Sequence, residues 1–209
     1  MPHRMRATRS RLRTVFVSDV HLGCKFSQAD RFLQFLEAHQ PEHLYIVGDF
    51  IDGWKLRKRW YWQSAYLRIF HRLMALRESG TQLYYAPGNH DDFLRHFLHD
   101  FGFVQIADEF IHTAADQRRF LVLHGDQFDE VERRFGWLSH VGSSLYDVIL
   151  WANATINRVR RGLRLSELQF SARLKLSVKQ AVRFVSQFEE RLAEHARQYF
   201  CDGIICGHI

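Results

Sequence analysis

Short apolar runs alternate with amphipathic segments along much of the chain. Five apolar runs rich in β-branched and aromatic residues are typical of strands. They lie at the start of segments 14–22, 43–50, 82–88, 118–126 and 202–209. Between them, residues 27–41 and 64–80 carry apolar side chains at helical spacing and end at a Pro or a Gly. Strands that alternate with helices predict an α/β fold.

Smaller elements complete this prediction. Ser27 is placed to cap the first helix, and residues 93–102 have the pattern of a short helix. Residues 103–114 are expected to add one or two antiparallel strands. The length of 209 residues and the hydrophobic content of 46% suit one domain with a large core.

Residues 130–200 interrupt the alternation. They show no strand pattern, so we predict a helical insertion, or lid, within a single domain that spans residues 1–209. Segment 155–183 is strongly basic, and its cations include the expected substrate contacts Arg160, Arg161, Arg164, Arg173, Lys175 and Lys179. The alternative is a helix pair that packs on the core with a solvated basic face.

The net charge indicates which partners the protein can bind, and the cysteine count indicates its compartment. The net charge of +6 and the pI near 9.5 favour a phosphorylated substrate, nucleic acid or an anionic membrane surface. The three cysteines, an odd and low count, indicate a reducing compartment. No apolar run reaches the roughly 18 residues of a membrane span, and the basic N-terminus lacks the apolar stretch of a signal peptide. We therefore expect a cytoplasmic protein, and its charge fits peripheral contact with the inner face of the cell membrane.

Polar residues follow each predicted strand at the point where it ends. The five ends read Ser18-Asp19-Val20-His21, Gly48-Asp49-Phe50-Ile51-Asp52, Gly88-Asn89-His90-Asp91, His124-Gly125-Asp126 and Gly207-His208. Turn chemistry explains Gly, Asn and Asp after a strand, but it does not explain a His at four of five ends. Ligands of an open α/β sheet bind outside the carboxyl ends of its strands, so these ends should gather at one place. The sequence therefore predicts a shared metal site.

The ligand types define the metal chemistry. Carboxylates, imidazoles and one amide oxygen, without a thiolate, suit Mn²⁺, Fe²⁺ or Zn²⁺. The ligands are too many for one ion, so two divalent ions about 3.5–4 Å apart, bridged by one carboxylate, are expected. We take Mn²⁺ as the first candidate cofactor and Fe²⁺ or Zn²⁺ as alternatives.

The blocks DVH, GDFID, GNHD, HGD and GH resemble, in this order, the signature blocks of the calcineurin-like metallophosphoesterases. They span residues 19–208, which is nearly the whole chain. The resemblance implies a fold of two facing mixed β-sheets flanked by helices. It also implies a metal-dependent hydrolase that cleaves a phosphoester or pyrophosphate bond with a hydroxide held between two metals.

By the same resemblance, the residues of the blocks would have distinct roles. The metal ligands would be Asp19 and His21 for the first ion, Asp49 as the bridge, and Asn89, His124 and His208 for the second. His90 would stand beside the substrate phosphate as a catalytic residue, and Asp91 would orient it. Asp52 would support the ligands from behind, and Asn89 would also face the substrate.

A finer resemblance is to the UDP-2,3-diacylglucosamine pyrophosphatase branch, which acts in lipid A synthesis. It rests on DVHLG, GDFIDGW, HGDQFD and LSVKQAV, and it implies a lipid-linked substrate. Two departures stand out, because the best-known members have Arg in place of His90 and the family continues Gly-His-x-His beyond Ile209. The missing His would be a further ligand of the first metal, so we expect the chain to be truncated at its C-terminus.

Two other functions stay open. The charge equally fits a nucleotide or nucleic-acid phosphodiesterase, or a non-catalytic basic binding protein with a degenerate metal site. Apolar residues between 145 and 156 favour a lipid-linked substrate over nucleic acid. Segment 53–63, with Trp54, Trp60 and Trp62 among four cations, fits a membrane-interface anchor, a nucleic-acid stacking surface or a dimer contact.

Overall fold

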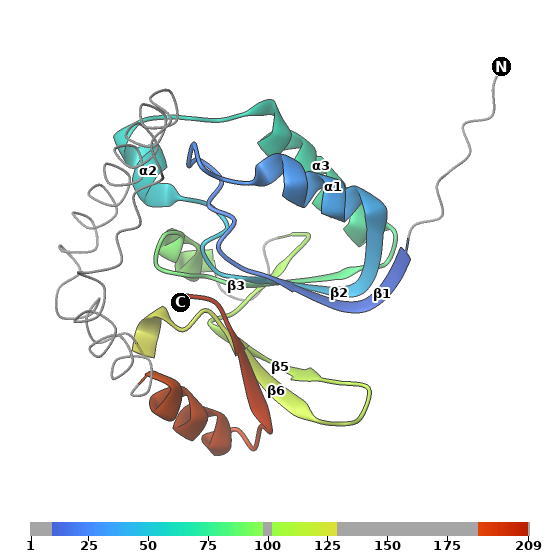
Figure 1. Cartoon of the computed structure of the whole chain (residues 1–209), viewed down its shortest axis with the longest axis vertical. Helices are drawn as coiled ribbons and strands as arrows, with labels where there is room; N and C mark the ends of the chain where they lie inside the picture. The colour runs from blue at the N-terminus through green and yellow to red at the C-terminus, as the bar shows by residue number, and fades with distance from the viewer. Residues whose placement is uncertain (1–9, 98–101, 129–187, 209) are drawn as a thin grey trace, which may run out of the picture. The chain divides into compact units, whose positions relative to one another are not determined.

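The computed structural model describes residues 10–97, 102–128 and 188–208 of the chain. The chain divides into two compact units, residues 1–126 with 195–209 and residues 127–194. Strands β1 to β7 all belong to the first unit (Figure 1). The predicted insertion, 130–200, lies mostly outside the described residues; of its described part, 188–198 are helical.

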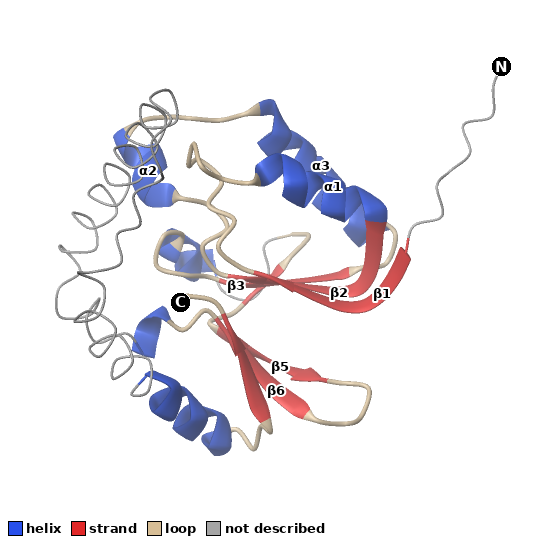
Figure 2. Ribbon diagram, viewed as in Figure 1, coloured by secondary structure: helices blue, strands red, loops and turns tan. Residues whose placement is uncertain are grey.

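The first sheet is parallel and has the strand order β1-β2-β3-β4 (Figure 2). Its strands are β1 (Ser10–Val17), β2 (His39–Val47), β3 (Gln82–Ala86) and β4 (Gln105–Ile106). The helices between them are α1 (Ala29–Ala38), α2 (Gly53–Lys58), α3 (Ser64–Glu78) and the short 3-10 helix η1 (Asp92–Phe97). Within the described ranges, no helix is long and apolar enough to cross a bilayer.

The second sheet is mixed and has the order β5-β6-β7. Its strands are β5 (Glu109–Thr113), β6 (Arg119–Leu123) and β7 (Gly203–Cys206), and a short 3-10 helix, η2 (Asp126–Phe128), follows β6. β5 pairs antiparallel with β6, and β6 pairs parallel with β7. The prediction of antiparallel strands in 103–114 is correct for β5 and wrong for β4, which runs parallel to β3. The segment between β3 and β4 includes η1 and is long enough for the crossover that a parallel pair needs.

Alternate residues of β2 face two different cores. Leu44 and Ile46 join the larger core, to which α1 and α3 contribute apolar side chains. Tyr45 points the other way and packs with Val122 of the second sheet. Because side chains alternate along a strand, the first sheet is covered by α1 and α3 on one face and by the second sheet on the other (Figure 1). The predicted architecture of two facing sheets flanked by helices is therefore present.

The segments that follow β1 and β2 stay hydrogen-bonded to each other after the strands end. The amide of His21 donates to the carbonyl of Asp49 at 2.9 Å, and Leu22 pairs with Ile51 in an isolated parallel bridge. This continued pairing sets the register between two of the polar strand ends. Backbone hydrogen bonds thus align the candidate ligands that follow β1 and β2, and this alignment does not require a metal ion.

Two predicted details differ in the structure. Ser27 does not cap α1, because its hydroxyl donates to the carbonyl of Val20 at 2.7 Å and the helix begins after Gln28 without a side-chain cap. Ser27 therefore ties down the loop after β1. The helix predicted for 93–102 is the 3-10 helix η1, and residues 98–101 lie outside the described ranges.

The buried guanidinium of Arg72 joins α3 to the end of α1 and the start of β2. Its Nε donates to the carbonyl of Leu36 at 2.9 Å, and its Nη2 donates to the carbonyl of His39 at 3.1 Å. Arg72 is only 9% exposed, so these bonds form away from solvent. A buried acceptor that loses its donor carries the full cost of its desolvation.

We predict that Arg72→Met lowers the free energy of unfolding by about 2–3 kcal/mol, because two carbonyls lose their donors while the apolar volume is kept. Urea unfolding followed by circular dichroism measures the change. The matched control is Arg77→Met, an exposed Arg on the same helix, which should change the free energy by less than about 0.5 kcal/mol. Equal losses in the two variants would contradict the assigned role.

Candidate metal centre

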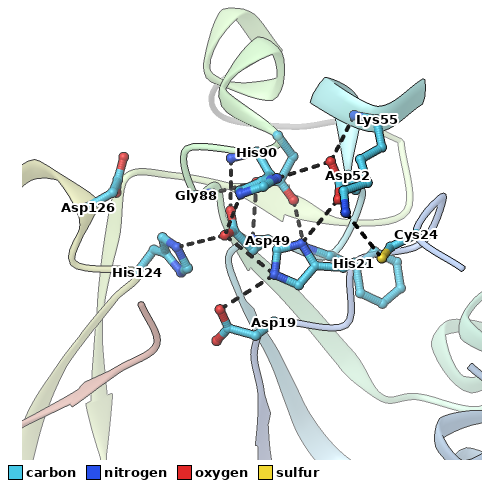
Figure 3. Close-up of polar contacts among 12 residues, drawn as sticks. Asp19, His21, Cys24, Asp49, Asp52, Lys55, Gly88, His90, His124 and Asp126 are labelled. Carbon is cyan, nitrogen blue, oxygen red and sulfur yellow. Dashed lines mark hydrogen bonds and ion pairs between the residues drawn. The ribbon is translucent and has the colours of Figure 1, made fainter. Parts of the chain in front are cut away.

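Three imidazole rings point toward one carboxylate oxygen at the carboxyl ends of the strands (Figure 3). Asp49 Oδ2 lies 3.5 Å from Nε2 of His124. The same oxygen lies 3.8 Å from Nε2 of His21 and 3.9 Å from Nε2 of His90. These residues follow β2, β6, β1 and β3, so strand ends from both sheets meet at one place, as the sequence pattern predicted.

The possible metal ligands form two groups that share one residue. In each group the ligand atoms lie within 4.8 Å of one another; the groups are His21 with Asp49 and His90, and Asp49 with His124 and His208. Membership in both groups is what a bridging carboxylate requires. Asp19 lies beside the first group, with its Oδ1 3.9 Å from His21 Nε2.

The end of β3 brings two further residues to this edge. The resemblance placed His90 beside the phosphate, whereas the structure also places its Nε2 among possible ligands of the first ion. Asn89 lies between Gly88, whose amide donates to Asp91, and His90, whose amide donates to Asp49. These backbone bonds hold the Asn89 segment against the end of β2.

Four of the expected ligands have a left-handed backbone conformation. Their φ angles are 57° for Asp19, 50° for His21, 52° for Asp49 and 57° for His208. Residues other than Gly seldom adopt such angles, and they persist only where the surrounding structure imposes them. Such strain is concentrated at functional sites, and here it falls on the residues that the strand-end pattern selected.

Three glycines leave room beside the ligands. A Cβ on Gly88 would lie 2.3 Å from Asp49 Oδ1 and 2.6 Å from the Cδ2 of His124. A Cβ on Gly48 would lie 2.2 Å from the Nδ1 of His124, and one on Gly207 would lie 3.0 Å from the same atom. Any side chain at Gly88 or Gly48 would therefore displace a candidate ligand.

His124 has one nitrogen held by the backbone and one directed at the site. Its Nδ1 bonds to the carbonyl of Val47 at 2.9 Å, which fixes the ring. Its Nε2 is buried and has no hydrogen bond within the described part of the chain. Burial lowers the pKa of His124, but the carboxylate of Asp49 outweighs burial and raises the pKa to about 9. The surroundings thus favour positive charge at this nitrogen, which a divalent ion would supply.

Asp49 is ionised although it is only 3% exposed. Burial raises the pKa of its carboxyl, but His124 and then His90 outweigh burial and lower the pKa to about 2. Its Oδ1 accepts a hydrogen bond from the amide of His90 at 2.9 Å, which leaves Oδ2 facing the rings. The anionic oxygen, the buried nitrogen of His124 and the space beside the glycines together fit divalent metal ions.

Asp91 does not orient His90, contrary to the prediction. Its fully buried carboxylate accepts five hydrogen bonds, from the amides of Asp49, Phe50, Ile51 and Gly88 and from the hydroxyl of Tyr85. Burial and the adjacent carboxylate raise the pKa of Tyr85 well above its usual value, so its hydroxyl stays protonated and donates. Asp91 therefore fixes the backbone at the ends of β2 and β3.

Asp52 and Trp54 hold the ring of His90 instead. Asp52 Oδ1 lies 3.0 Å from His90 Nδ1, and the indole of Trp54 stacks on the ring with centroids 4.0 Å apart. Burial raises the pKa of Asp52, but its bonds from His90 and from the amide of Lys55 outweigh burial, so the pKa lies below its usual value. An ionised carboxylate at Nδ1 leaves Nε2 of His90 directed toward the metal centre.

Arg95 is a structural residue of the site that the sequence analysis missed. Its guanidinium forms two bonds to Asp126, at 3.0 and 2.9 Å, and one to Asp108 at 3.1 Å. It also donates to the carbonyl of Pro87 at 3.0 Å. Arg95 thus joins the loop after β3 to the loop after β6. An Arg in a short helix looks like any solvated cation in the sequence, and its partners are distant along the chain.

The predicted substrate contacts of the insertion lie outside the described residues. They are Arg160, Arg161, Arg164, Arg173, Lys175 and Lys179. Their contact with an anionic substrate stays a prediction, as does the contact of Asn89 with substrate.

Two groups of possible metal ligands that share Asp49 lie at the strand ends of two facing sheets, an arrangement that suits a metal-dependent hydrolase. The family model of calcineurin-like phosphoesterases matches residues 12–209. The chain belongs to this family, which confirms the resemblance drawn from its sequence blocks.

Similar proteins extend this comparison. The UDP-2,3-diacylglucosamine hydrolase of Proteus mirabilis (strain HI4320) is 33% identical over 117 residues, which cover 54% of this chain and 48% of the relative. The hydrolase of the same name from Tolumonas auensis is 32% identical over 129 residues, which cover 58% of this chain and 51% of the relative. The chain spans about half the length of the curated relatives it matches. A crystal structure of the nuclease MPE of Pseudomonas putida is 22% identical, covers 46% of this chain and 48% of that chain, and has a TM-score of 0.31.

We predict that Gly88→Ala lowers the affinity for Mn²⁺ by about 10- to 100-fold, because the added Cβ would displace Asp49 or His124. Equilibrium dialysis followed by elemental analysis measures the metal bound per chain. The control is Gly102→Asn, at a left-handed position with φ 67° and open space around it, a conformation that Asn adopts more readily than other residues do. Circular dichroism should show both variants folded, and equal metal binding by the two would refute the argument.

Proposed function

We propose that the chain is a dinuclear metal-dependent hydrolase of a phosphoester or pyrophosphate bond. The observation that carries this proposal is the ionised carboxylate of Asp49, which two ligand groups share. Membership of the calcineurin-like phosphoesterase family supports the reaction type. The ions would be held by Asp19, His21 and Asp49 on one side and by Asp49, Asn89, His124 and His208 on the other, and Mn²⁺ is the ion we propose.

When bound, two divalent ions supply a nucleophile by lowering the pKa of water, and they neutralise charge on the phosphate. We propose that His90 acts on the leaving group, and two contacts support this role: its Nδ1 is held by Asp52 and its Nε2 is directed toward the centre. A proton on Nε2 can pass to the leaving oxygen as the bond to phosphorus breaks. The carboxylate of Asp52 stabilises the protonated ring, and Trp54 limits its rotation.

For the substrate, we propose UDP-2,3-diacylglucosamine or a similar lipid-linked nucleotide. Both curated relatives described above carry the name UDP-2,3-diacylglucosamine hydrolase. The net charge of +6 suits an anionic pyrophosphate. Hydrolysis of the pyrophosphate bond of such a substrate would give UMP and a lipid monophosphate. We also propose the cytoplasm as the compartment, which fits the three free cysteines.

A substrate panel tests the proposed function. The Mn²⁺-loaded protein is incubated with UDP-2,3-diacylglucosamine, a cyclic dinucleotide or p-nitrophenyl phosphate, and the products are identified by mass spectrometry. We expect UMP from the first substrate and none after removal of metal with a chelator. Turnover of the cyclic dinucleotide alone would replace this proposal with a nucleotide phosphodiesterase. Two bound metals without any turnover would instead favour a non-catalytic binding protein.

The pairing of His90 with Asp52 gives a prediction about the leaving group. His90→Ala should lower kcat by roughly 10²- to 10⁴-fold on an alkyl phosphate, whose leaving oxygen needs a proton. The loss should be far smaller on p-nitrophenyl phosphate, whose leaving group departs as a stable anion. Asp52→Asn should show the same dependence with a smaller loss, because an amide can still accept a bond but does not stabilise a protonated ring. Steady-state rates on the two esters measure both effects.

The matched control is Asp92→Asn, an exposed carboxylate on η1, which should keep both rates. The metal content of each variant separates the possible roles of His90. Loss of metal from His90→Ala would make it a ligand, in line with its place in the first group. An equal loss of rate on both esters with metal retained would make it a clamp on the phosphate rather than an acid.

A further inference from the structure

A basic surface segment of the first unit carries an exposed indole. Arg57, Lys58, Arg59 and Trp60 are consecutive and all exposed, and Trp60 is 71% exposed. No acidic residue occurs between positions 53 and 77 of the sequence. We call these four residues together with Trp62 the Trp60 patch. Its cations therefore have no acidic neighbours along the chain to neutralise them.

The exposed ring of Trp60 is attached firmly to the core. It stacks on Trp62 with ring centroids 5.5 Å apart and planes inclined by 17°. Trp62 in turn packs on the edge of Tyr66 at 5.2 Å and stacks on Phe70 at 6.1 Å, both on α3. The fold thus exposes the large apolar surface of the Trp60 indole to solvent, beside Arg57, Lys58 and Arg59. Scattered apolar residues on a surface need no explanation, but an ordered aromatic stack that ends in solvent is typical of an interaction site.

Two more exposed apolar side chains lie on segments that are linked to the patch through Tyr66. Leu67 is 54% exposed and follows Tyr66 on α3. Phe26 is 57% exposed and lies two residues beyond Cys24, whose carbonyl accepts a hydrogen bond from the hydroxyl of Tyr66. Both segments thus expose an apolar side chain in addition to the indole.

We propose that the Trp60 patch docks this protein on an anionic membrane surface. Trp partitions into the headgroup region of a bilayer, and Lys and Arg are attracted to anionic lipids. The charge of the patch is complementary to such a surface. A nucleic acid would also attract the cations, but single strands stack successive bases on several exposed rings, and Trp60 is the one exposed ring of the patch, since Trp62 is only partly exposed. Leu67 and Phe26 suit the acyl boundary, where an aliphatic chain is as favourable as a ring.

This inference does not depend on the proposed substrate, because vesicle binding is measured without catalysis. The protein is sedimented with vesicles of phosphatidylcholine containing 30% phosphatidylglycerol, and with vesicles of phosphatidylcholine alone. We expect binding to the anionic vesicles that weakens at high salt. Trp60→Ala should lower the partition coefficient by about tenfold, since the buried apolar area is lost. Lys58→Glu should lower it by roughly tenfold, since an attraction becomes a repulsion.

Two control variants match these changes elsewhere on the surface. Phe200→Ala removes an aromatic ring that is 83% exposed, and Arg118→Glu reverses a cation whose side chain is 63% exposed. Both should bind vesicles as the unmodified protein does. All four variants should hydrolyse p-nitrophenyl phosphate at the unmodified rate, if the protein hydrolyses it at all. A failure of the hydrolase proposal therefore leaves the vesicle test intact.

Three results would overturn the proposal. The first is no binding of the unmodified protein to anionic vesicles, and the second is unchanged binding of Trp60→Ala. The third is that Trp60→Ala loses binding of a single-stranded oligonucleotide, or turns a dimer into a monomer in analytical ultracentrifugation, while vesicle binding stays the same. The third result would assign the patch to nucleic acid or to a second copy of the chain. Quenching of indole fluorescence by brominated lipid, abolished by Trp60→Ala, would support the proposal directly.

Discussion

Five hydrogen-bond donors converge on the carboxylate of Asp91, and the geometry of the metal centre depends on them. Three of the donors are the successive amides of residues 49–51, which turn sharply away from β2. A buried amide without a partner costs about 1–3 kcal/mol, so this acceptor stabilises a turn that would otherwise be unfavourable. The turn gives Asp49 its left-handed φ of 52° and directs its Oδ2 at three imidazole rings. A fourth donor, the amide of Gly88, holds the end of β3 to the same point.

The other half of the centre depends on how the two sheets face each other. His124 and His208 follow strands of the second sheet, while Asp49 follows a strand of the first. Aromatic rings lie between the sheets, where Tyr45 stacks on Tyr84 with centroids 4.3 Å apart and both pack on Phe110. Packed aromatic layers resist compression. The spacing of the sheets, and with it the separation of the two ligand groups, is therefore set by residues that never approach a metal.

The sequence predicted the strand ends well because a parallel sheet brings carboxyl ends to one edge whatever the side chains do. Asp49 and His90 meet for this reason, because they follow neighbouring parallel strands although they are far apart along the chain. The predicted partner of His90, Asp91, was wrong, and the reason is again physical. Asp91 is its neighbour in sequence, but the backbone turns that carboxylate inward, and Asp52 from another loop meets the ring. The bonds of Arg95 to Asp126 and Asp108 could not be predicted from the sequence, because tertiary contacts alone bring these residues together.

The order of the ligands along the chain has a consequence for biosynthesis. His21, Asp49 and His90, which form the first ligand group, all belong to the segment that builds β1, β2 and β3. A nascent chain leaves the ribosome from its N-terminus, so this group can assemble while the second sheet is still being translated. The second group waits for His124 and His208, which follow β6 and β7. Metal loading would then be sequential, with the shared carboxylate engaged by one ion before the pocket for the other exists.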